Sequence, residues 1–119
     1  MIRTVPRLVA AVVLTVCLVS AASPAGADTT IAATIVNYKY QPNPMTVQVG
    51  DIVIWTNQDQ APHDVTSTSG PSKLASPQLN QGDQWGYKFT QPGTYTYYCT
   101  LHPDMHATLT VLAAPSGDE

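Results

Sequence analysis

Residues 93–112 read GTYTYYCTLHPDMHATLTVL, and this stretch decides the fold class. Along Thr94–Cys99 and His106–Leu112, residues suited to a core alternate with more polar residues. This period of two predicts two β-strands, each with one buried face. The inward positions are Tyr95, Tyr97 and Cys99 on the first strand and Ala107, Leu109 and Val111 on the second. We expect a short loop that contains a proline to join the two strands, directly after the cysteine.

Further strands are expected wherever β-branched and apolar residues collect between turn formers. Their predicted ranges are Thr30–Tyr38, Met45–Val49, Ile52–Thr56, Val65–Thr68 and Trp85–Thr90. The connection over residues 69–82 is rich in Ser, Pro, Gly, Gln and Asn, and has room for at most one short strand. With no repeats and no amphipathic helix, the pattern predicts an all-β Greek-key β-sandwich of seven to eight strands.

The start of the chain has the composition of an export signal. Arg3 and Arg7 precede an apolar run over residues 8–19, and small residues end the segment at Ala25–Ala27. This run is shorter than the roughly 20 residues that a membrane-spanning helix needs, so we expect cleavage and no membrane anchor. The predicted divisions are a signal peptide over residues 1–27, a single domain over residues 28–119 and a disordered tail over residues 113–119.

The charge of the mature chain limits its partners. Three lysines stand against eight acidic residues once the leader is removed, which leaves a net charge of −5. Negative charge disfavours nucleic acid and anionic membranes, and is compatible with a basic or apolar protein surface. We expect a monomer outside the cytoplasm, in a periplasm or at the cell surface.

Cysteine usage is more informative than charge. Cys17 lies in the predicted leader, so the mature chain keeps only Cys99 and cannot form an intramolecular disulfide. A thiol outside the cytoplasm oxidises unless it is buried or bound by a metal ion. An inert buried thiol or an intermolecular bridge is the alternative to metal binding.

The residues next to this cysteine favour metal binding. Cys99, His102 and Met105 follow one another at three-residue spacings, and His63 opens a predicted strand that a sandwich can bring beside them. Two imidazoles and a thiolate with a weak thioether form the donor set of blue copper, whereas structural zinc favours further Cys or His. The sequence therefore predicts one copper ion bound by these four residues.

These motifs resemble those of the cupredoxins. Residues 93–105 are similar to the cupredoxin copper loop, most of all to the amicyanins, which share the short Cys-x-x-His-x-x-Met spacing. Residues 45–63 resemble the plastocyanin-like pattern that leads to the first histidine ligand. The resemblance implies a type 1 site with His63, Cys99 and His102 as strong ligands and Met105 as the axial ligand. It also implies an electron carrier that is not an enzyme and that exchanges single electrons with redox partner proteins.

The sequence departs from the family pattern at two aspartates. Asp64 stands where the family usually has Asn; its backbone N–H is expected to donate to the Cys99 sulfur and its carboxylate to reach Thr100. Asp104 stands where an apolar residue is expected on the docking face around His102. The other residues expected on that face are Leu101, Pro103, Ala61 and Pro62.

Other functions find less support in the residues. A nitrite reductase or multicopper oxidase needs further copper ligands, and this chain has three histidines in all. Copper delivery remains the alternative, although delivery sites are usually exposed and rich in Met or His. The remaining histidine, His106, is expected on the surface, and the aspartates Asp51, Asp59 and Asp83 are expected to be solvated loop residues.

Overall fold

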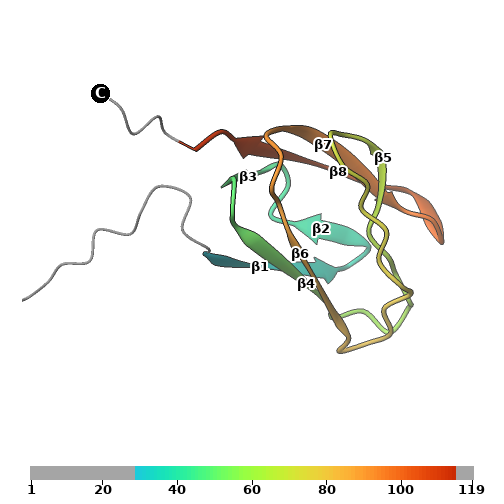
Figure 1. Cartoon of the computed structure of the whole chain (residues 1–119). Helices are drawn as coiled ribbons and strands as arrows, with labels where there is room; N and C mark the ends of the chain where they lie inside the picture. The colour runs from blue at the N-terminus through green and yellow to red at the C-terminus, as the bar shows by residue number, and fades with distance from the viewer. Residues whose placement is uncertain (1–28, 115–119) are drawn as a thin grey trace, which may run out of the picture.

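The computed structural model describes residues 29–114 as a sandwich of two four-stranded β-sheets (Figure 1). The strands are β1 (Thr30–Val36), β2 (Lys39–Gln41), β3 (Met45–Gln48), β4 (Ile52–Asn57), β5 (Thr66–Ser69), β6 (Gln84–Lys88), β7 (Gly93–Cys99) and β8 (His102–Leu112). The predicted all-β sandwich is confirmed, with eight strands. The predicted leader and residues 115–119 of the predicted tail lie outside the described residues.

The strand order explains how distant segments reach the same end of the sandwich. One sheet has the order β2-β1-β4-β6 and the other the order β3-β8-β7-β5. β1 pairs with β4 and β3 with β8 in parallel, and the remaining pairs are antiparallel. In Figure 1 the turn between β7 and β8 lies opposite the two ends of the described chain. Over residues 29–114 we find no helix of the length and apolarity that crossing a membrane requires.

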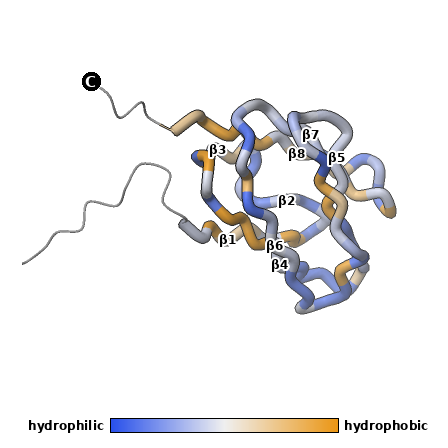
Figure 2. Tube along the Cα trace, in the orientation of Figure 1, coloured by the Kyte–Doolittle hydropathy of each residue, from blue (hydrophilic) through white to orange (hydrophobic). Residues whose placement is uncertain are grey.

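The core lies between the sheets and follows the predicted alternation. The predicted inward residues of β7 and β8 are all buried, which confirms the assignment of their faces. Trp55 is fully buried, and its Nε1–H donates to the Tyr97 hydroxyl at 3.4 Å. Burial raises the pKa of Tyr97 to about 12, so this hydroxyl stays protonated at neutral pH. Figure 2 shows long hydrophobic stretches on β1 and mostly hydrophilic connections at the lower edge of the view.

Two predicted boundaries near the site were wrong, β2 was not predicted as a separate strand, and the other strand ends that differ do so by one or two residues. β8 begins at His102 rather than at His106, because Cys99 pairs with His102 across a two-residue turn while Tyr98 pairs with His106. The register shift is a β-bulge that pushes residues 103–105 out of the ladder. β1 ends at Val36 rather than at Tyr38, because Val36 pairs with Lys39 and the two residues between them form the hairpin turn to β2.

The long connection after β5 contains no strand among the described residues, but it is tied to the sandwich at two points. Isolated β-bridges pair His63 with Leu79 and Thr66 with Ala75. Leu74 and Leu79 are buried, so the connection contributes to the core. The bridge at His63 places the start of the β5 segment at a fixed position beside the β7–β8 turn.

Candidate metal centre

The loop that carries His63 is organised by a buried amide side chain. Asn57 ends β4, and its Nδ2 donates to the carbonyls of Ala61 and Leu79, each at 2.9 Å. Its Oδ1 accepts the backbone N–H of Asp59 at 2.9 Å. Because Asn57 is fully buried, these bonds are shielded from water and hold the loop in one conformation. The loop therefore delivers a fully buried His63 to the end of the sandwich.

His63 and Cys99 meet in direct contact. The Nδ1 atom of His63 lies 3.7 Å from the Sγ atom of Cys99, and both side chains are fully buried. The sulfur also accepts the backbone N–H of Asp64 at 3.4 Å, as predicted. A hydrogen bond to sulfur stabilises the thiolate, which is the form that binds metals.

Asp64 joins the two segments that carry these residues. Its Oδ1 accepts the Thr100 backbone N–H at 3.0 Å and its Oδ2 accepts the Thr100 hydroxyl, which confirms the predicted bridge. The backbone carbonyl of Asp64 accepts the Tyr40 hydroxyl at 2.5 Å. Burial raises the pKa of Tyr40 well above its usual range, so Tyr40 keeps the proton that it donates. Asp64 is thus held from both sides and fixes the turn after Cys99.

Replacing Asp64 by Ala is expected to lower the free energy of unfolding by about 3 kcal/mol, because partly buried donors on Thr100 lose their acceptor. Urea denaturation of the metal-free chain measures this change. Asp83→Ala is the control, since Asp83 is exposed and accepts one turn amide, from Asn80 at 2.9 Å. A loss for Asp64→Ala no greater than for the control would contradict the bridging role.

The structure places His102 and Met105 beside this pair. The His102 ring centroid lies 4.8 Å from that of His63, and its Nε2 is buried without a hydrogen-bond partner among the described residues. Met105 is buried in the bulge of β8 and lines the same surface hollow as His102. Within residues 29–114 no three His, Cys, Asp or Glu side chains alone form a metal-binding group. His63, Cys99 and His102 are thus close to one another in this structure without forming, as a trio, a metal-binding arrangement.

The donor set fits a soft or borderline metal ion. A buried ring nitrogen without a partner is unfavourable unless it binds something, and His102 Nε2 is such an atom. Imidazole, thiolate and thioether donors suit copper better than hard cations such as magnesium or calcium. The four residues named from the sequence therefore provide suitable donors at one end of the sandwich, and their assignment as ligands stays a prediction.

Comparison with known proteins agrees with this chemistry. The family model described as Cupredoxin-like domain matches residues 8–111. This chain belongs to the cupredoxin-like family. Amicyanin from Paracoccus denitrificans is 35% identical over 88 residues, which cover 71% of this cupredoxin and 67% of that protein. The resemblance seen in the copper-loop motif is confirmed.

Solved structures support the same family assignment for this cupredoxin. An amicyanin variant in its Cu(I) form superposes with a TM-score of 0.66 at 36% identity, over 72% of this chain and 85% of that chain. A Cu-containing nitrite reductase from Thermus scotoductus superposes with a TM-score of 0.68 at 26% identity. That match covers 74% of this chain but only 23% of the reductase.

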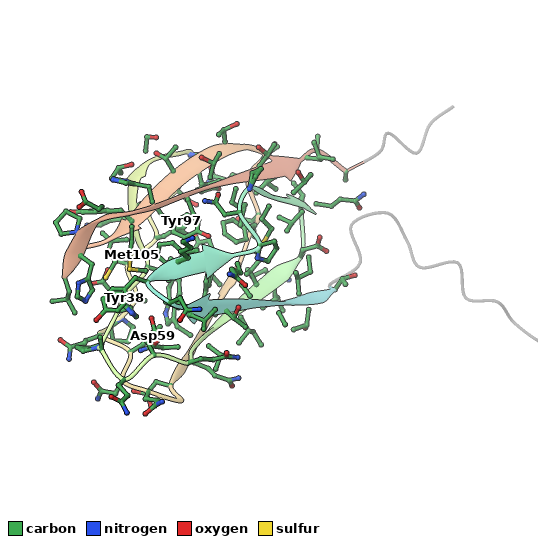
Figure 3. All side chains as sticks on the ribbon, turned by 180° about the vertical axis from the view of Figure 1, so that it is seen from behind. Tyr38, Asp59, Tyr97 and Met105 are labelled. Atoms are coloured by element: carbon green, nitrogen blue, oxygen red, sulfur yellow. The ribbon has the colours of Figure 1, made fainter. Side chains whose placement is uncertain are left out.

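Two residues of this cupredoxin approach the site without having been predicted there. Tyr38 extends from the β1–β2 turn, and its ring meets those of His63 and His102 edge-on, with centroid distances of 5.0 and 4.8 Å. Asp59 accepts a hydrogen bond from His63 and is half-buried, so its assignment as a solvated loop residue was wrong. The same assignment was wrong for Asp51, which is buried and accepts the Gln48 backbone N–H. Figure 3 shows Tyr38, Asp59 and Met105 at the same end of the sandwich. The only signal in the sequence is the position of Asp59 four residues before a predicted ligand.

The charge state of Asp59 follows from its contacts. Partial burial tends to raise the pKa of its carboxyl. The hydrogen bonds from the Tyr38 and Asn37 amides and from His63 outweigh this effect, so the pKa lies below its usual value. Asp59 is therefore an anionic acceptor at neutral pH.

A hollow of about 390 Å³ adjoins the site at the surface, and Tyr38, Leu101, His102, Pro103, Asp104 and Met105 line it. Leu101 and Tyr38 are among the large hydrophobic residues exposed in the described chain. Two residues predicted for this face, Ala61 and Pro62, are half-buried and are not among those that line the hollow. Tyr38, which was not predicted for this face, adds exposed apolar surface to it.

Proposed function

We propose that this chain is an exported type 1 blue copper protein that carries single electrons between redox partner proteins. Its ligands are His63, Cys99, His102 and Met105. The observation that carries the proposal is the buried contact of 3.7 Å between His63 Nδ1 and Cys99 Sγ, close to His102, whose Nε2 has no hydrogen-bond partner within residues 29–114. The similarity to amicyanin supports the same function.

One copper ion supplies the redox chemistry by alternating between Cu(I) and Cu(II). The protein supplies a rigid donor set, which limits the rearrangement that accompanies electron transfer. Asp64 clamps the turn after Cys99 to the His63 segment through its bonds to Thr100. Met105 lies in the three bulged residues of β8, between His102 and His106, which are both paired with β7.

Copper delivery is the second candidate, and retention of the metal separates the two functions. A carrier keeps its copper through repeated oxidation and reduction, whereas a delivery protein passes copper to an acceptor. The test is cyclic voltammetry of the copper-loaded chain with a copper chelator in the solution. A reversible one-electron wave with full copper retention supports the carrier, and rapid loss of copper to the chelator supports delivery.

Export is part of the proposal. We infer that residues 1–27 are a signal peptide, that residues 28–119 form one domain, and that the mature chain works as a monomer in a periplasm or at the cell surface. The basic start, short apolar run and small residues before Asp28 support this division. Mass spectrometry of the chain from its native cell fraction is expected to show an N-terminus at Asp28.

Replacing Met105 by Leu is expected to leave copper bound and to raise the reduction potential. A weak axial donor stabilises Cu(II) more than Cu(I), so its removal favours the reduced form. Leu has a similar volume, so packing around this buried position is largely conserved. Voltammetry measures the shift.

Met45→Leu is the matched control for this variant. Met45 is as buried as Met105, at 4% against 5% exposure, but it lies in β3 and pairs with Leu109. The control is expected to leave the potential unchanged. Loss of copper from Met105→Leu, or a lower potential, would contradict an axial role for Met105.

A further inference from the structure

One carboxylate contacts three groups around the site. Oδ1 of Asp59 accepts the Asn37 backbone N–H at 2.7 Å, and Oδ2 accepts the Tyr38 backbone N–H at 2.8 Å. The same Oδ2 lies 2.9 Å from Nε2 of His63. Asp59 therefore links the β1–β2 turn to the first imidazole of the proposed centre.

The contact with His63 determines where the imidazole carries its proton. Both oxygens of Asp59 already accept a backbone N–H, as a carboxylate does, so we assign the Nε2 atom of His63 as the donor in their contact. In the neutral imidazole Nδ1 then keeps a free lone pair, and this atom lies 3.7 Å from the Cys99 sulfur. The tautomer that Asp59 selects is thus the one whose free nitrogen points to the proposed metal position.

The contact with the turn holds a backbone conformation that few residues adopt. Asn37 and Tyr38 have φ angles of 55° and 60°, both in the left-handed region. Two such residues form a type I′ hairpin turn, in which Asn is common at the first position and Gly at the second. A bulky Tyr at the second position is disfavoured, because its Cβ crowds the backbone. The two hydrogen bonds to Asp59 stabilise this turn.

The conformation of the β1–β2 turn also determines where the Tyr38 ring lies. Although Tyr38 is 51% exposed, its ring meets the rings of both His63 and His102 edge-on. Figure 3 shows the labelled Tyr38 between Met105 and Asp59. A strained turn beside a functional site is typically held there by specific contacts, and Asp59 supplies them here.

We propose that Asp59 is a positioning residue of the copper centre, which orients His63 through Nε2 and holds Tyr38 over both imidazoles. This inference rests on the proposed function, since it assigns a role around the same centre. Outer partners of metal-bound histidines fix the orientation of the ring and typically change metal affinity by about 10- to 100-fold.

The test compares the full chain with its Asp59→Ala variant in two measurements. Nitrogen NMR of the His63 ring before copper is added is expected to show one tautomer, protonated on Nε2, in the unaltered chain and a mixture in the variant. Copper titration against a competing chelator is expected to show affinity about 10- to 100-fold weaker for the variant. Asp83→Asn is the matched control, because Asp83 also accepts a loop amide but is not bonded to an imidazole.

A second variant keeps the test decisive if Asp59→Ala fails to fold. Adding Asn37→Gly to Asp59→Ala relaxes the left-handed turn without restoring the carboxylate. The double variant is expected to fold and still to show mixed His63 tautomers and weak copper binding. Unchanged tautomer and affinity in the folded variant would overturn the inference. Absence of a blue band from the unaltered copper-loaded chain would instead overturn the proposed function, and the NMR comparison would still decide the role of Asp59.

Discussion

Replacing Cys99 by Ser is expected to abolish the intense visible band of the Cu(II)-loaded chain. In a type 1 site this band arises from charge transfer from the cysteine sulfur to copper, and a hydroxyl cannot reproduce it. The structure places Sγ of Cys99 fully buried, in contact with His63 Nδ1 and hydrogen-bonded to Asp64 N–H. Absorption spectra with one equivalent of Cu(II) measure the effect.

The Cys99→Ser variant must be shown to fold, so that loss of the band can be attributed to loss of the sulfur ligand. Circular dichroism of both metal-free chains provides this control. Met45→Leu, which removes a buried sulfur elsewhere, is expected to leave the band intact. A folded Cys99→Ser chain that remains blue would show that another residue supplies the sulfur ligand.

Replacing Leu101 by Lys is expected to slow electron transfer to the redox partner by about tenfold to a hundredfold. Burying a leucine side chain contributes about 1.5–3 kcal/mol, and each 1.4 kcal/mol changes an equilibrium tenfold. Leu101 is 44% exposed and lines the hollow with His102, so a partner that docks there covers it. Stopped-flow measurement gives the rate, and the visible spectrum is expected to stay nearly unchanged.

Leu112→Lys is the matched control, because Leu112 is 47% exposed but lies at the other end of β8. Asp104→Lys is a second comparison: it reverses a charge at the border of the hollow and is expected to weaken the salt dependence of association with a basic partner. Equal rates for Leu101→Lys and Leu112→Lys, with copper loading verified, would place the docking surface elsewhere.

Local pattern was enough to predict the main strands and their buried faces. The alternation in β7 and β8 places Tyr95 and Cys99 inward because each face of a strand meets either core or water, and the structure confirms this. The bridge from Asp64 to Thr100 was also predicted, from the position of Asp64 in the family pattern.

The boundaries around the site were harder to predict. The stretch from Thr100 to Met105 was expected to be a loop, since Pro103 weakens a strand pattern. Strand pairing instead begins at His102, and the bulge accommodates the proline. The turn between the two strands is also held by Asp64, which binds Thr100 from 36 residues away, and no local periodicity in the sequence indicates such a contact.

The sequence by itself determined which donor atoms this protein offers, because residue types and the spacing of Cys99, His102 and Met105 are local properties. Only the tertiary structure decided which acid meets which imidazole. Asp59 is one of three aspartates next to turn formers, and nothing in its neighbours separates it from Asp83. It reaches His63 and the amides of a turn 21 and 22 residues upstream because the folded sheets bring the β1–β2 turn against the loop after β4. Hydrogen bonds between distant segments depend on the final position and direction of each group, and these exist only once the chain has folded.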